Sequence, residues 1–136
     1  MSLARFLDAH RDTYDTALAE LRAGDKHSHW MWFIFPQIAG LGVSPTARFY
    51  ALRDLDEAQA YLAHPLLAAR LAECIDAMLG WAGQRSAEAI LGGIDAVKLR
   101  SSCTLFEAAG GDARFGQCLA AFFDGARDAA TLALLR

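Results

Sequence analysis

The apolar residues of this chain recur at intervals of three and four positions, and this spacing limits what it can fold into more than any other feature. One face of a predicted helix over residues 3–22 carries Leu3, Phe6, Leu7, Tyr14, Ala17, Leu18 and Leu21. Ser2 can cap the start of this helix, and Gly24 can end it in a left-handed conformation. Valine and isoleucine are scarce, and no stretch alternates as a half-buried strand does. The chain is therefore predicted to be all-α.

Capping signals divide the rest of the chain into further helices. Residues that commonly open or cap a helix stand at Ser44-Pro45, Asp54, His64-Pro65, Ser86, Asp95 and Asp112. Glycines at 92–93, 110–111 and 125 separate the later segments. With 136 residues, of which 54% are hydrophobic, the chain can bury one core. We expect residues 1–136 to form a compact single-domain bundle of about seven to nine short and medium helices.

Charge and cysteine content argue against several classes of function. The formal net charge is -3 and no basic run is present, so we expect neither a nucleic-acid partner nor a membrane surface. The three cysteines never occur as C-x-x-C, which disfavours a disulfide framework or a zinc site. No secretory signal is visible, and the chain reads as a cytoplasmic protein without a metal or cofactor.

Residues 26–37, KHSHWMWFIFPQ, depart from this regular pattern. If Ser28 caps a short helix here, Trp30 and Trp32 lie on different faces, and the helix is apolar on most sides. One interpretation is a concave site walled by the aromatic side chains, with polar groups at both ends of the segment. The other is that the aromatic side chains fill the core and the polar residues cap the helix.

A second candidate segment spans residues 95–106. At helical spacing, Asp95, Lys98 and Ser102 form a polar stripe beside apolar neighbours. Hydroxyl side chains are poor choices for a helix interior, because they compete for backbone hydrogen bonds. This stripe is either a solvated helix face or part of a site, in which Lys98 and Asp95 hold a ligand anion or a water molecule.

Together these segments resemble a known family. The similarity covers residues 26–37, 40–44, 50, 61–66, 95–98 and 102–106. By these residues the chain resembles a bacterial domain-of-unknown-function family often labelled "calpastatin". The resemblance implies a compact all-helical domain and no established activity. The family's signature residues fall in both candidate segments, so we expect the two segments to meet in the fold.

These observations favour binding of a small planar anionic, nucleotide-like metabolite in an aromatic-walled pocket. The predicted ligand-binding residues are Lys26, Trp30, Trp32, Phe35, Gln37, Lys98 and Ser102. If the protein is an enzyme, hydrolysis without a metal would follow, with His29 as the catalytic proton-transfer group. The alternative is a non-catalytic module for protein interaction or self-association. A third interpretation is that both segments only complete the core, and the oligomeric state stays open.

Overall fold

The helical periodicity of the sequence is confirmed by a computed structural model, which describes residues 3–136. These residues form nine α-helices and no strand: α1 (Ala4–Ala23), α2 (Met31–Ile34), α3 (Pro45–Tyr50), α4 (Leu55–Ala63), α5 (Pro65–Leu79), α6 (Ala87–Leu91), α7 (Gly93–Ala108), α8 (Ala113–Phe123) and α9 (Ala129–Leu134). The all-α prediction is therefore correct. No helix within residues 3–136 is both long enough and apolar enough to cross a bilayer.

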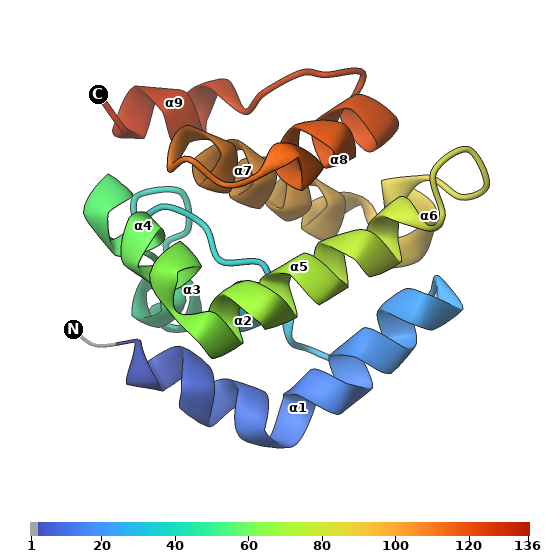
Figure 1. The fold of residues 1–136 in the computed structure, drawn as a ribbon, viewed down its shortest axis with the longest axis horizontal. Helices are drawn as coiled ribbons and strands as arrows, with labels where there is room; N and C mark the ends of the chain where they lie inside the picture. The colour runs from blue at the N-terminus through green and yellow to red at the C-terminus, as the bar shows by residue number, and fades with distance from the viewer. Residues whose placement is uncertain (1–2) are drawn as a thin grey trace.

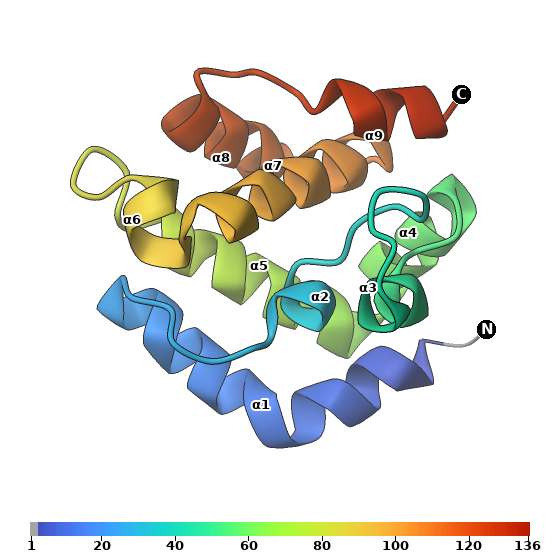
Figure 2. The ribbon, with the colours of Figure 1, turned by 180° about the vertical axis from the view of Figure 1, so that it is seen from behind.

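The helices are stacked in tiers around α5. In Figure 1, α5 crosses the middle of the molecule, α1 lies on one side of it, and α7, α8 and α9 lie on the other. Helix α5 contacts α1, α4 and α8, and α7 contacts α4, α6, α8 and α9. Seen from behind, α2 lies in front of α5, and the chain that follows it runs past α7 toward α3 (Figure 2). This returning segment is the part of the fold that shapes the candidate site.

Most helix boundaries follow from the predicted caps. The side chains of Ser44, Asp54, His64 and Ser86 each accept a hydrogen bond from a backbone N–H in the first turn of the helix that follows. Gly24 ends α1 at φ 70°, in the left-handed conformation expected for it. The predicted cap at Ser2 lies outside the described residues. Local hydrogen bonding thus accounts for where these helices begin and end.

The caps predicted at Asp95 and Ser28 are wrong, and in both cases the side chain has a partner on another segment of the chain. Helix α7 begins at Gly93 with Gly92 as its cap, so Asp95 lies within its first turn. The Asp95 carboxylate instead pairs with two lysines. Ser28 does not cap α2, whose cap residue is Trp30. The Ser28 hydroxyl instead donates to Glu20 of α1.

A buried ion pair fixes α1 to the start of α4. The Arg5 guanidinium lies 3.0 Å from the carboxylate of Glu57, and both side chains are buried. Arg5 also donates to the backbone carbonyls of Phe49 and Ala51. The end of α3, which borders the candidate site, is therefore attached to α1.

Candidate ligand-binding site

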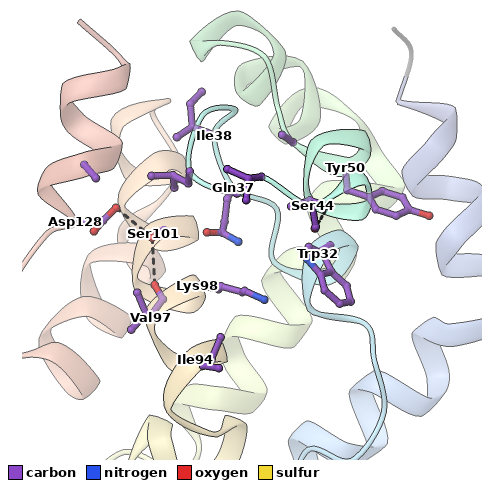
Figure 3. Close-up of a pocket in the computed structure, with 16 residues that line it drawn as sticks. Trp32, Gln37, Ile38, Ser44, Tyr50, Ile94, Val97, Lys98, Ser101 and Asp128 are labelled. Atoms are coloured by element: carbon purple, nitrogen blue, oxygen red, sulfur yellow. Dashed lines mark hydrogen bonds between the residues drawn. The ribbon is translucent and has the colours of Figure 1, made fainter.

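A cavity of about 660 Å³ lies between α7 and the segment that links α2 to α4. Its lining is mainly apolar, and it includes Trp32, Ile38, Leu41, Val43, Ile94 and Val97. The polar side chains that reach it are Gln37, Ser44, Lys98, Ser101 and Asp128. Figure 3 shows these groups on α7, on the returning segment and at the start of α9, with Trp32 of α2 opposite Lys98. An apolar hollow with a few polar groups is the usual form of a small-molecule site.

The wall of the cavity formed by residues 37–52 is held in place by backbone hydrogen bonds. The N–H of Ala39 donates to the carbonyl of Leu52 at 2.7 Å, and the N–H of Leu52 donates to the carbonyl of Gln37 at 2.9 Å. Gly40 sits in the loop they close, at φ 105°, and a Cβ there would lie 3.0 Å from Leu134 of α9. Both the conformation and the close approach favour glycine at this position.

Helix α2 presents Trp32 to the cavity because its other side chains face inward. Met31, Phe33 and Ile34 are buried, whereas Trp32 is half-buried. The carbonyl of Phe33 accepts a hydrogen bond at 2.7 Å from Nε2 of the buried His10. Burial lowers the pKa of His10, so the neutral ring that donates this bond is favoured. Helix α2 is thereby fixed against α1, and Trp32 is held at the cavity.

Glu20 shapes the approach of the chain to α2. Its carboxylate accepts hydrogen bonds from the N–H groups of His27 and Ser28, the hydroxyl of Ser28 and the indole of Trp30, at 2.6–2.9 Å. Partial burial by itself raises the pKa of Glu20, but these hydrogen bonds outweigh burial and lower the pKa to about 2. The polar tetrapeptide before the aromatic run is therefore held by α1.

Lys98 connects the cavity to the other candidate segment. Its Nζ lies 4.8 Å from the ring centroid of Trp32 and 3.3 Å from Oδ1 of Asp95. Oδ2 of the same carboxylate lies 3.0 Å from Nζ of Lys26, which is itself 5.0 Å from the ring centroid of Trp30. The two candidate segments, residues 26–37 and 95–106, therefore lie side by side.

The other end of the cavity carries the carboxylate of Asp128, which is not among the predicted site residues. Ser101 lies one turn beyond Lys98 on α7, about 4.5 Å along the helix axis. Its hydroxyl is within hydrogen-bond distance of Oδ2 of Asp128, at 3.1 Å, and of the Val97 carbonyl, at 3.2 Å. Asp128 also caps α9 by accepting from Thr131. An Asp-x-x-Thr capping pattern was the only local signal for Asp128, and it did not indicate a site.

The residues predicted to form the site separate into two groups. Trp32, Gln37 and Lys98 line the cavity. The remaining predicted residues do not line it, because Trp30, Phe35 and Ser102 are buried in the core, Lys26 lies behind Asp95 and His29 is exposed. The expected aromatic wall is thus Trp32 and Tyr50, together with aliphatic side chains of the returning segment and α7.

Side chains that could bind a metal ion are not clustered within residues 3–136. Residues 3–136 contain no group of three or more His, Cys, Asp or Glu side chains that could hold a metal ion. Cys74, Cys103 and Cys118 are buried and unpaired.

Comparison with known proteins identifies the family. Residues 1–135 match the model of a family described as "Protein of unknown function (DUF1810)". The fold is similar to the crystal structure of the conserved hypothetical protein Rv1873 from Mycobacterium tuberculosis, with a TM-score of 0.94 and 47% identity over 98% of this chain and 95% of that one. Neither description carries the label "calpastatin", and no curated protein matches the chain. The chain belongs to the DUF1810 family of proteins of unknown function.

Proposed function

We propose that this protein binds a small planar anionic, nucleotide-like metabolite in the cavity between α7 and the segment after α2. The observation that carries the proposal is the pairing of the Trp32 ring with the Lys98 ammonium, 4.8 Å apart in the lining of one cavity. An indole face stacks on a planar ring, and a neighbouring ammonium neutralises an attached anionic group.

The size and lining of the cavity support this proposal. Its volume of about 660 Å³ lies within the range of roughly 300–1,000 Å³ that is usual for sites of small molecules. Gln37 offers both a hydrogen-bond donor and an acceptor between the two ends. Asp128 and Ser101 at the far end suit a hydroxyl or amino group of the ligand, because both can accept hydrogen bonds.

The geometry supports binding more directly than hydrolysis. The catalytic role of His29 stays a prediction, and its exposed side chain does not belong to the cavity lining. The ionisable side chains in the lining are Tyr50, Lys98 and Asp128. Because His29 lies outside this lining, we propose binding alone as the function.

Native mass spectrometry of freshly purified protein tests the proposal, followed by a thermal-shift screen with nucleotides and aromatic carboxylates. We expect a co-purified species or a stabilising compound whose effect is lost in Lys98→Met. Arg11→Met is the matched control, because it removes the same charge from the exposed surface of α1. No bound species and no stabilisation by any compound would contradict the proposal.

A second candidate function is supported by the apolar rim of the cavity. Val43 and Ile94 are each 78% exposed, and Val97 is 57% exposed. Apolar side chains exposed together commonly mark a protein interface. If the rim mediates self-association, sedimentation velocity will detect a dimer that the substitution Ile94→Glu disrupts. A monomer at all concentrations would leave only the small-molecule proposal.

A further inference from the structure

One carboxylate is shared between the only two lysines of the sequence. Asp95 places Oδ2 3.0 Å from Lys26 and Oδ1 3.3 Å from Lys98. Together, the two ammonium groups and the carboxylate have a net charge of one positive unit. The pairs differ in their access to solvent, because the Lys26 side chain is 9% exposed and the Lys98 side chain is 25% exposed.

The two lysines also differ in what they face. Lys26 lies over the buried ring of Trp30, and its backbone N–H donates to the Ile90 carbonyl at 2.8 Å. Lys98 lies over the ring of Trp32, which the cavity exposes. In Figure 3 the Lys98 side chain extends from α7 toward Trp32, across the cavity-facing side of the helix. Lys98 can therefore contact a ligand in the cavity, whereas Lys26 is confined behind Asp95.

We infer that a ligand anion replaces Asp95 as the partner of Lys98, while Lys26 keeps Asp95 neutralised. This inference rests on the proposed function. The ligand class is an aromatic compound with one anionic group, such as a carboxylate, sulfonate or phosphate monoester, because Lys98 is the one ammonium of the two that can reach the cavity. Lys98 contacts the ligand, and Lys26 and Asp95 act as positioning residues.

Coulomb interactions explain why Lys26 affects a ligand that it does not touch. An anion next to Lys98 lies within a few ångströms of Asp95, and two like charges at that distance repel each other. Pairing with Lys26 cancels most of this repulsion. Without Lys26, Asp95 has only Lys98 as a partner, so it competes with the ligand and repels it.

Fluorescence titration with 8-anilino-1-naphthalenesulfonate, an aromatic monoanion, tests this account. We expect one molecule to bind per chain, and we expect Lys98→Met to weaken binding about tenfold. Lys26→Met should weaken it about threefold to fivefold, the usual size for a partly exposed charge interaction. Asp95→Asn should bind the probe at least as tightly as the wild type. Adding Asp95→Asn to Lys26→Met should restore the affinity, because the competing carboxylate is gone.

The variants separate this mechanism from loss of structure and from failure of the site. Thermal unfolding of each variant reports stability, and Arg11→Met should bind the probe as the wild type does. If Lys98→Met weakens binding but Lys26→Met does not, the exchange mechanism is wrong and the site stands. If Asp95→Asn does not rescue Lys26→Met, Lys26 acts through structure alone and the mechanism is also wrong. If neither this probe nor any screened metabolite binds the wild type, both proposals fail.

Discussion

Replacing Glu20 with Gln should destabilise the protein by an amount that depends on pH. The Glu20 carboxylate accepts four hydrogen bonds from residues 27–30, and its pKa is about 2 rather than 4.5. A difference of this size corresponds to at most about 3.4 kcal/mol of folding free energy. Glu20 is only half-buried, so solvent screening reduces the expected loss to about 2 kcal/mol. This loss is similar to the contribution of about 1.5–3 kcal/mol that is typical of a hydrogen bond to a charged group.

The sign of the pH dependence follows from the lowered pKa. Above about pH 4.5 Glu20 is ionised in both the folded and unfolded states, and its full contribution is present. As the pH falls through 2, the folded state must take up the proton and the contribution is lost. The difference in unfolding free energy between wild type and Glu20→Gln should therefore be largest at neutral pH and shrink between pH 4.5 and 2.

Urea denaturation followed by circular dichroism, at several pH values from 7 to 2.5, measures this difference. Glu88→Gln is the matched control, because it removes the same charge from an exposed position in α6 and should cost less than about 0.5 kcal/mol. If Glu20→Gln unfolds within about 0.5 kcal/mol of the wild type at pH 7, our account of this segment is wrong. A difference that did not change with pH would also contradict it.

Three further predictions concern the core. Arg5→Met should cost about 3 kcal/mol in urea denaturation, since it leaves the buried Glu57 carboxylate with only the more exposed Arg53 guanidinium, 3.5 Å away, and a loss below about 1 kcal/mol would refute this. Gly111→Ala should cost about 1–3 kcal/mol, because its Cβ would lie 2.6 Å from an aromatic ring of α8; Gly93→Ala, with open space around it, should unfold almost like the wild type. All three cysteines are buried, and burial raises the pKa of Cys74 to about 12, so native protein at pH 8 should not react with a thiol reagent until it unfolds. Rapid labelling of the folded state would contradict the described packing.

The helices could be predicted from sequence because their signals are local. A cap side chain and the N–H groups it satisfies lie within three residues of each other, as at Ser44 and His64. The failures at Ser28 and Asp95 share one cause. The Ser28 hydroxyl donates to Glu20 of α1, and the Asp95 carboxylate pairs with Lys26 as well as with Lys98 of its own helix. Long-range ion pairs and hydrogen bonds of this kind leave no trace in local spacing.

The candidate site could be predicted only in part, for a related reason. Residue type and spacing pointed to Trp32, Gln37 and Lys98, which do line the cavity. Trp30 has the same side chain as Trp32 two positions away, yet it is buried in the core and its indole donates to Glu20. Asp128 enters the cavity because α9 folds back over α7, and a single sequence contains no information that pairs these helices.

The central claim is that the cavity between α7 and the segment after α2 is a ligand site. The chain has three tryptophans, and Trp30 and Trp81 donate their indole N–H groups to Glu20 and to the Leu21 carbonyl. Protein labelled with ¹⁵N-tryptophan therefore offers three indole resonances of which one belongs to the cavity. Titration with 8-anilino-1-naphthalenesulfonate, and then with adenosine monophosphate, should shift the Trp32 resonance saturably and leave the Trp81 resonance in place. Binding that shifts Trp81 but not Trp32 would contradict the claim.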